Sequence, residues 1–187
     1  DFTDADIDTL KDTVRRFATE QVRPHVDAWE AACEIPRTLY RQAAGLGLLG
    51  LGYPEHLCGT PAPWRARNAL SQTLARYGGS GGVMASLFSH SIGLPPIVAH
   101  GSQALQRRIV PEVLAGEKIA ALAITEPGGG SDVARLCTRA RRDGQEWVID
   151  GEKSFITSGM RADWITLAVR TGGPGAAGIS LIVVPGD

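Results

Sequence analysis

Apolar residues near the start of the chain recur every three to five positions, with Asp, Lys and Arg between them. This stripe consists of Ile7, Leu10, Val14, Phe17 and Val22. Such spacing predicts an amphipathic helix. Thr3 or Asp4 can cap its start, because a short side-chain oxygen accepts a hydrogen bond from the free N–H groups of the first turn. Pro24 is expected to kink or end the helix.

Helical spacing continues through the first two thirds of the chain. A helix is predicted from near Pro36 into the glycine-spaced run at 45–52, and the segment 53–63 is predicted to be a loop. Further helices are predicted at 64–77, at 83–92 and at 103–114. The segment 83–92 is nearly all apolar and is therefore expected to be buried.

After Gly116 the pattern changes to short runs rich in Val, Ile, Thr and Trp. Strands are predicted at 147–149, 154–157, 164–169 and 179–184. Asp143-Gly144 and Asp150-Gly151 stand where tight hairpins need a positive φ. The second part is thus predicted to be antiparallel β. The order of helices followed by strands predicts an α+β chain of two domains, an all-α domain at 1–116 and a β domain at 117–187.

Composition and charge narrow the function classes. The 187 residues are 43% hydrophobic, and 19 basic against 20 acidic residues leave a net charge of −1. No block of like charge favours nucleic acid, and no apolar run approaches the roughly 20 residues that span a bilayer. We expect no membrane insertion and a cytoplasmic location. The three cysteines and four histidines are scattered, so we expect small buried thiols and no metal site.

The most informative segment is the run Leu122 to Asp132. A short apolar strand leads into Pro127 and three consecutive glycines, Gly128–Gly130. Glycines let backbone N–H groups approach an anion closely, and the Ser131 hydroxyl can donate as well. The run lacks the spacing of the P-loop and of the Rossmann fingerprint. It is interpreted either as a phosphate cradle or as a hairpin loop without a ligand.

A second motif decides between these readings. Thr125-Glu126-Pro127-Gly128-Gly129-Gly130-Ser131-Asp132 is followed by Gly151-Glu152-Lys153-Ser154-Phe155-Ile156-Thr157-Ser158-Gly159. This pair resembles the signature of the acyl-CoA dehydrogenase family, and the resemblance extends from Gly47 to Ser180. It implies a helical N-terminal domain and an FAD-binding, barrel-like antiparallel β domain that is incomplete here. The C-terminal helical bundle of the family has no counterpart in these residues.

The resemblance implies an FAD site made by both motifs. The residues implied to bind the cofactor are Leu122, Ile124, Thr125, Gly130, Ser131, Phe155, Ile156 and Thr157. Thr125 would face the pyrimidine edge of the flavin, and Phe155 would stack on the ring. Thr157 would lie near the flavin N5. Ser131 would lie at the pyrophosphate and also touch the CoA arm of the substrate.

Each of these residues also has a plain structural reading. Phe155, Ile156 and Thr157 taken singly are ordinary strand residues. Glu126 and Asp132 are expected to serve a turn or cap rather than act as a base, because a carboxylate beside a phosphate repels it. The family commonly has Trp where Phe155 stands and Asn where Ser158 stands.

The apolar segment 83–92 suggests a substrate contact. The resemblance implies that Met84 and Phe88, together with Ile92 on one helical face, line the acyl-chain cavity. Core packing alone would give the same pattern, so both interpretations stay open.

The family reaction removes a proton from the α-carbon and a hydride from the β-carbon of an acyl-CoA, which gives a trans-2-enoyl-CoA. The resemblance implies a role in lipid metabolism such as fatty acid β-oxidation, electron transfer to an electron-transfer flavoprotein, and a homo-oligomer, dimer or tetramer. The catalytic base is expected in the C-terminal bundle, so no catalytic residue is assigned here. The chain is expected to be a fragment that cannot dehydrogenate alone. The alternatives are an acyl-CoA oxidase or flavin monooxygenase, and a noncatalytic flavin- or acyl-CoA-binding module.

Overall fold

The structure is a computed structural model that describes residues 2–186, and these form two compact units. The helical unit comprises the described residues up to Phe88 together with Gln103–Lys118. The sheet unit comprises Ser89–Ser102 and the described residues from Ile119 onward. The structure thus groups a helical segment, Ser89–Ser102, with the sheet. The division into domains 1–116 and 117–187 stays a prediction.

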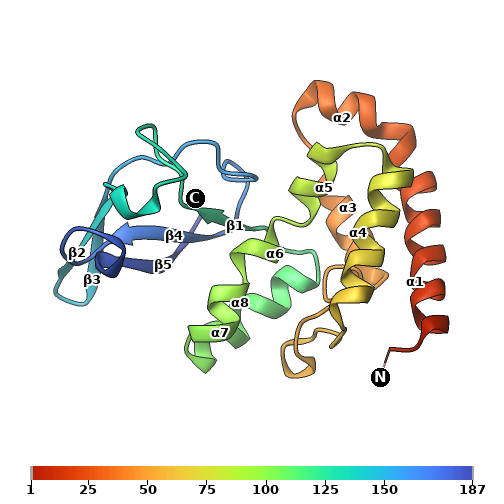
Figure 1. The fold of residues 1–187 in the computed structure, drawn as a ribbon, viewed down its shortest axis with the longest axis horizontal. Helices are drawn as coiled ribbons and strands as arrows, with labels where there is room; N and C mark the ends of the chain where they lie inside the picture. Colours follow the sequence, from red (N-terminus) through yellow and green to blue (C-terminus); the bar gives the residue numbers. More distant parts are fainter. Residues whose placement is uncertain (1, 187) are drawn as a thin grey trace. The chain divides into compact units, whose positions relative to one another are not determined.

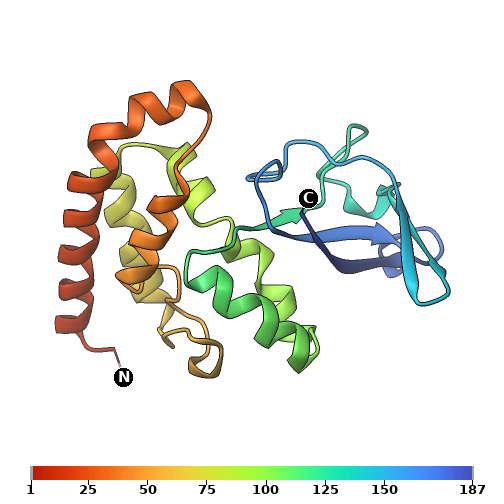
Figure 2. The same ribbon diagram turned by 180° about the vertical axis from the view of Figure 1, so that it is seen from behind.

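Long helices with one apolar face build the helical unit, and Figure 1 labels them. They are α1 (Asp4–Phe17), α2 (Val26–Ala32), α3 (Arg37–Gly45), α4 (Trp64–Gly78), α5 (Gly81–Leu87) and α8 (Gln103–Leu114). The predicted cap is confirmed, because the Thr3 hydroxyl accepts from the Asp6 N–H and the Asp6 carboxylate accepts from the Thr3 N–H. Helices α1 and α4 lie side by side in Figures 1 and 2.

The region around Pro24 is more helical than predicted. Regular α-helix ends at Phe17, a π-helical turn follows at Ala18–Val22, and Pro24 lies in the 3₁₀ turn Arg23–His25. Helix α2 comes next and was missed. Val26 is its single buried residue, so its apolar pattern is too weak to predict a helix.

The core of the helical unit is made of fully buried aliphatic side chains. These include Val14, Val22, Leu39, Leu49, Leu57, Leu74, Leu87, Ile109, Val110 and Val113. The helices predicted at 64–77 and 103–114, the helix starting near Pro36 and the loop at 53–63 are confirmed.

The prediction of a single buried helix at 83–92 is wrong. Helix α5 ends at Leu87, and a separate short helix, α6 (His90–Gly93), follows in the sheet unit. The break lies at Phe88, where the backbone leaves the helical region at φ −109° and ψ 21°, and the Ser89 hydroxyl that follows donates to the Ala120 carbonyl at 2.8 Å. Ile92 is 50% exposed, so Met84, Phe88 and Ile92 do not form one buried helical face.

The sheet unit contains the short helices α6 and α7 (Pro95–His100) and five strands. The strands are β1 (Ala120–Ala123), β2 (Arg139–Asp143), β3 (Glu146–Asp150), β4 (Trp164–Arg170) and β5 (Ile179–Pro185). Helix α6 is fixed to this sheet, because the Thr166 hydroxyl donates to the Gly93 carbonyl at 2.7 Å. A Cβ at Gly93 would lie 3.0 Å from the Ala121 carbonyl oxygen, so glycine permits this close approach.

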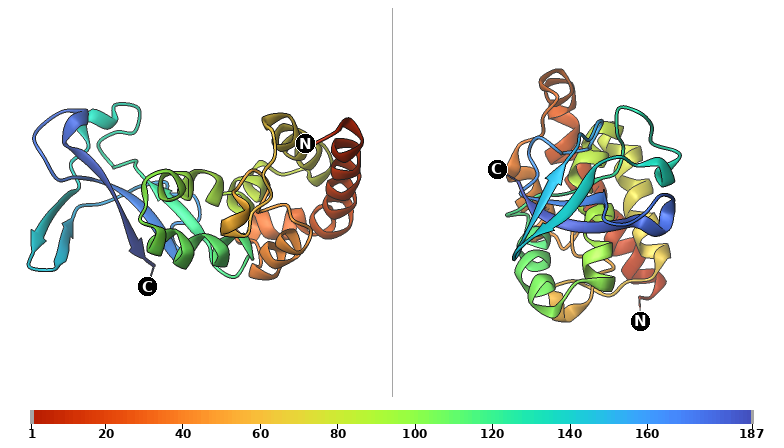
Figure 3. Two further views of the ribbon diagram at one scale, coloured as in Figure 1. Left: turned by 90° about the horizontal axis from the view of Figure 1, so that it is seen from below. Right: turned by 90° about the vertical axis from the view of Figure 1, so that its left-hand side faces the viewer.

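The prediction of a purely antiparallel β domain is also wrong. Over residues 2–186 the sheet is mixed, and it does not close into a barrel. Strand β4 pairs in parallel with β1 and with the start of β2, and antiparallel with β5. Strands β2 and β3 form an antiparallel hairpin, visible as two adjacent arrows in Figure 3. Period-two patterns locate strands but do not state the direction of their partners.

Three local predictions concern the tight turns and the segment 154–157 of the sheet unit; one is confirmed and two are wrong. The Asp143-Gly144 hairpin is confirmed, with Gly144 at φ +62°. Asp150-Gly151 forms no hairpin, and 154–157 is not a strand but an irregular segment with Phe155 at φ +58°. Left-handed backbone at a bulky residue interrupts a strand pattern that side-chain type alone suggests.

The cysteines are not buried, contrary to expectation. Cys33, Cys58 and Cys137 are free and exposed. Cys33 and Cys58 end short helical segments in the left-handed region, at φ 52° and 65°.

Residues 2–186 contain neither a single helix that could span a membrane nor a cluster of side chains suited to a metal. No single helix within 2–186 is long and apolar enough to cross a bilayer, and the broken run Gly81–His100 reaches that length and composition only as a pair of helical pieces. The same part of the chain holds no cluster of three or more His, Cys, Asp or Glu side chains suited to a metal.

Candidate functional site

The glycine motif lies in a long loop that leaves the edge of one strand and returns to it. Strand β1 pairs with β4 as far as Leu167, and β2 meets the same strand again at Arg170. Residues 124–138 run between these two points. We call this segment the glycine loop. Its ends are therefore fixed by neighbouring residues of one strand.

A tight turn opens the glycine loop. The Glu126 N–H donates to the Gly129 carbonyl at 3.1 Å, and the Gly129 N–H donates back at 3.0 Å. Gly129 has φ +155°, and a Cβ added to it or to Gly128 would meet nothing within 4 Å. The backbone of this turn is thus open to approach by another molecule. A Cβ at Gly130 would lie only 3.2 Å from the Thr125 hydroxyl, so Gly130 brings the turn close to Thr125.

Glu126 ties the turn to the far end of the glycine loop. Its carboxylate accepts from the Cys137 N–H at 2.6 Å and from the Thr138 N–H at 2.8 Å. It also accepts from the Lys153 ammonium at 2.9 Å, and the two side chains are 10% and 9% exposed. Glu126 therefore serves the turn-and-cap role expected from the sequence.

These contacts set the protonation state of Glu126. Burial by itself raises the pKa of this carboxyl group. Hydrogen bonds from the Thr138 side chain and the Cys137 N–H, followed by Lys153 and the Thr138 N–H, outweigh burial and lower the pKa to about 2. The group is an anion at neutral pH and a poor proton acceptor.

The second motif is held against the first by its own backbone and lysine. The Lys153 ammonium donates to the Ile124 carbonyl at 2.9 Å as well as to Glu126. The Ser154 N–H donates to the Thr125 carbonyl at 2.9 Å. The two motifs, separated by about 25 residues in sequence, thus meet at Thr125.

The segment that follows projects side chains outward. Phe155 is 96% exposed and Met160 is 99% exposed. Phe155 and Ser158 both have left-handed backbone, at φ 58° and 62°. For a bulky residue such a conformation costs on the order of 1–3 kcal/mol and is concentrated at functional sites. A large aromatic ring held outward at that cost indicates a surface that binds a ligand.

The remaining candidate residues divide between the units. Leu122, Ile124, Thr125, Gly130 and Ile156 are half-buried in the sheet unit, and Ser131 and Thr157 are exposed there. A cavity of about 200 Å³ is lined by Ile124, the three glycines and Leu136, among others. Met84 and Phe88 are half-buried in the helical unit.

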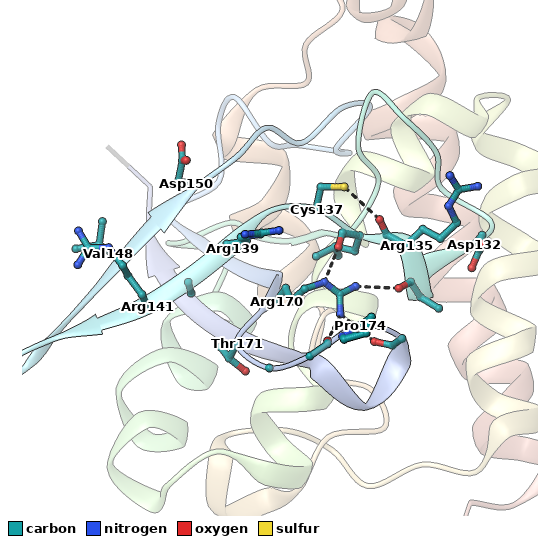
Figure 4. A pocket seen from close by; sticks show the side chains of 16 residues that line it. Asp132, Arg135, Cys137, Arg139, Arg141, Val148, Asp150, Arg170, Thr171 and Pro174 are labelled. Atoms are coloured by element: carbon teal, nitrogen blue, oxygen red, sulfur yellow. Dashed lines mark hydrogen bonds between the residues drawn. The ribbon is translucent and has the colours of Figure 1, made fainter.

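A larger cleft of about 980 Å³ shares Asp132, Arg135, Leu136 and Cys137 with the smaller cavity. Figure 4 shows its charged lining, which consists of Arg135, Arg139, Arg141 and Arg170 with Asp132 and Asp150. Four cationic against two anionic side chains favour an anionic ligand.

Sequence reasoning assigned no role to Lys153 or Arg170. Lys153 stands inside the second motif, and its charge opposite that of Glu126 was the available signal. Arg170 follows an apolar strand without any nearby acidic residue, so nothing in the local sequence indicated its contacts.

Two family models together match nearly the whole chain. The model described as "Acyl-CoA dehydrogenase, N-terminal domain" matches residues 4–117, and "Acyl-CoA dehydrogenase, middle domain" matches residues 121–187. The matches meet at the point where helices give way to strands.

Individual relatives agree with these matches. "Acyl-CoA dehydrogenase apdG" of Emericella nidulans is 35% identical over 91% of this chain and 43% of its own length. A crystal structure from Mycobacterium smegmatis, assigned as an acyl-CoA dehydrogenase, has a TM-score of 0.94 and 51% identity over 98% of this chain and 48% of that one.

A third relative carries a cofactor in its description. A glutaryl-CoA dehydrogenase from Mycobacterium smegmatis, solved in complex with FADH2, has a TM-score of 0.87 and 28% identity over 99% of this chain and 46% of that one. The chain spans somewhat less than half the length of each of these three proteins.

Proposed function

The chain belongs to the acyl-CoA dehydrogenase family, and on that premise we propose that it forms part of a flavin-dependent acyl-CoA dehydrogenase. The proposed reaction converts an acyl-CoA thioester to a trans-2-enoyl-CoA with FAD as hydride acceptor. The observation that carries the proposal is the meeting of the two motifs at Thr125.

The residues of this region fit a flavin. The turn at Gly128 and Gly129 is open, which suits backbone approach to a pyrophosphate. Phe155 offers a wholly exposed flat face to an aromatic ring system. Hydroxyl donors stand nearby on Thr125, Ser131 and Thr157. The region thus provides an aromatic face and polar donors together.

Each side chain then has a proposed task. Phe155 would stack on the isoalloxazine, with Leu122, Ile124 and Ile156 as apolar neighbours. Thr125 and Thr157 would donate to its polar edge. Gly130 and Ser131 would hold the pyrophosphate, and Ser131 would also touch the CoA arm. Met84 and Phe88 are proposed to border the acyl group.

The chemistry that FAD supplies when bound is acceptance of the hydride from the β-carbon. The described residues would bind and orient the cofactor. We assign no base among them, because Glu126 is committed to backbone N–H groups and to Lys153, and its pKa of about 2 suits an anion anchor instead.

The wider assignments extend the same proposal. Acyl-CoA is the proposed substrate, in fatty acid β-oxidation or related lipid metabolism. An electron-transfer flavoprotein is the proposed electron acceptor. A homo-oligomer, dimer or tetramer, completes the part of the proposal that is based on family membership. The cytoplasmic location is a separate proposal, made from the sequence alone.

The test is made on the protein at its full natural length. Purified protein reconstituted with FAD should show flavin absorbance near 450 nm, and an acyl-CoA should bleach it without oxygen uptake. Oxygen consumption during turnover would indicate an oxidase or monooxygenase instead.

A variant pair links the result to this site. Phe155→Ala should weaken FAD binding by about tenfold, since an aromatic stacking contact is worth up to about 1.4 kcal/mol. Leu181→Ala is the matched control, because Leu181 is a large apolar side chain exposed on β5, outside both motifs. Equal loss of FAD in both variants would contradict the assignment of Phe155.

A further inference from the structure

Arg170 stands at the end of β4, where two loops come together. One is the later part of the glycine loop, and the other is the β4–β5 loop, residues 171–178. Both loops line the cleft of about 980 Å³. The Arg170 N–H also donates to the Thr138 carbonyl at 2.7 Å, which joins β2 to β4.

The Arg170 guanidinium bonds to both loops at once, as the dashed lines in Figure 4 show. Nε donates to the Leu136 carbonyl at 3.0 Å, and Nη2 donates to the Ala134 carbonyl at 2.8 Å. Nη1 donates to the carbonyls of Gly173 at 2.7 Å and Gly175 at 3.0 Å. Four carbonyl groups on two loops are thus held by one planar fork of donors.

Within residues 2–186 no carboxylate is among the partners of Arg170. Its partners are backbone dipoles, which orient the loops but leave the positive charge uncancelled. The charge therefore adds to the cationic character of the cleft, while the hydrogen bonds fix the cleft's shape.

We infer that Arg170 is a positioning residue for substrate binding: it clamps the two loops that wall the cleft, so that the acyl-CoA meets a preformed site beside Ser131. This inference rests on the proposed function for its substrate. Without the clamp, binding must order both loops, and ordering a loop or a long side chain costs on the order of 0.5–1.5 kcal/mol each time.

Kinetics of the full-length protein test the role in binding. Arg170→Gln should raise KM for acyl-CoA about tenfold while kcat stays within about twofold, because the clamp acts on binding and not on the reacting atoms. Arg170→Lys keeps the charge but not the fork, and should resemble Arg170→Gln. A lysine variant with wild-type KM would show that charge alone matters and would overturn the inference.

Arg142 provides the matched control. It lies on β2 outside the lining of the cleft, and its guanidinium lies over the Trp147 ring at 5.2 Å. Arg142→Gln removes an arginine charge without releasing either loop, so its KM should stay within about twofold of wild type. A rise equal to that of Arg170→Gln would contradict the clamp.

Amide hydrogen exchange tests the clamp without any activity. Reporter amides exist in both loops, because the Arg135 and Leu136 N–H groups bond within the glycine loop and the Thr171 and Gly172 N–H groups bond to Gly178. Arg170→Gln should speed exchange at all four, and Arg142→Gln at none. Unchanged exchange would overturn the inference, whereas failure of wild-type protein to act on any acyl-CoA would instead overturn the proposed function.

Discussion

The helical unit and the loop region of the sheet unit are stabilised in opposite ways. By loop region we mean residues 124–138, 151–160 and 171–178. In the helical unit, buried aliphatic side chains make the core, and ion pairs such as Lys11–Asp8 lie on the surface. In the loop region, charged side chains are drawn inward onto backbone groups, while large apolar side chains such as Phe155 face outward.

The contrast indicates what each part is for. A helix packed through its apolar face takes most of its stability from that packing. Glu126, Lys153 and Arg170 hold the loop segments through contacts on one side, which leaves the other side free to contact a ligand. The same polar contacts make the region sensitive, because a buried charge that loses its partner is costly. Five substitutions and one pH dependence test the comparison, from the largest effect to the smallest.

The helical core should respond most strongly to loss of volume. Leu74 in α4 is 1% exposed, and a Cβ at Gly78 would lie 3.3 Å from its Cδ1 atom. Leu74→Ala should lower the free energy of unfolding by about 2–5 kcal/mol, measured by urea denaturation with circular dichroism. FAD absorbance of the folded variant should be unchanged. Loss of flavin from a fully folded variant would break the separation between the two regions.

The Glu126 anchor should be nearly as important, through charge instead of volume. Glu126→Gln leaves Lys153 without its carboxylate and replaces one acceptor oxygen by an NH2 group. We expect a loss of about 3 kcal/mol in the free energy of unfolding. Leu181→Ala serves again as the control in the sheet unit.

The same anchor gives a pH dependence with a defined sign. The pKa of Glu126 is lowered from 4.5 to about 2 in the folded protein. Its contribution is therefore fully present above about pH 4.5 and is lost as the pH falls from there to about 2. Urea midpoints at pH 2.5 to 5 should fall more steeply for wild type than for Glu126→Gln. Parallel curves for the two proteins would mean that Glu126 has an ordinary pKa.

Two glycines separate crowding from simple backbone preference. A Cβ at Gly151 would lie 2.6 Å from the Thr138 hydroxyl at φ +146°, whereas one at Gly144, φ +62°, would meet nothing within 4 Å. Gly151→Ala should cost about 3 kcal/mol in unfolding free energy and Gly144→Ala about 1 kcal/mol. Equal costs would show that the Gly151 backbone can move away from Thr138.

Surface ion pairs of the helical unit should matter least. Lys11 and Asp8 lie 3.0 Å apart, with side chains 49% and 74% exposed. Lys11→Met should change the free energy of unfolding by less than about 0.5 kcal/mol, because solvent screens the pair. A loss above 1 kcal/mol in the free energy of unfolding, in the same denaturation assay, would contradict the expected difference between this surface pair and the Glu126 contacts.

Local periodicity and turn chemistry carried the sequence predictions that held. The stripe Ile7 to Phe17 with its Thr3 cap gave α1, and Asp143-Gly144 gave the β2–β3 hairpin. Each depends on residues close together in the chain. The family motifs likewise pointed to the stretch around Thr125, where the structure joins the two.

Features set by distant contacts could not be predicted in the same way. The parallel pairing of β1 with β4 depends on residues more than 40 positions apart. Ser89, just after the break at Phe88, bonds to the distant Ala120, and the segment 154–157 is held by Thr125 and Lys153. Side-chain type alone predicts a strand there, because Phe, Ile and Thr all favour strands.

Titration of the full-length protein with FAD, followed by flavin fluorescence, tests the central claim that the two motifs form one flavin site. The account predicts saturation at one FAD per chain for wild type and about tenfold weaker binding for Phe155→Ala, with Arg142→Gln unchanged. A wild-type protein that takes up no FAD, or a Phe155→Ala variant that binds it as tightly as wild type, would contradict the claim.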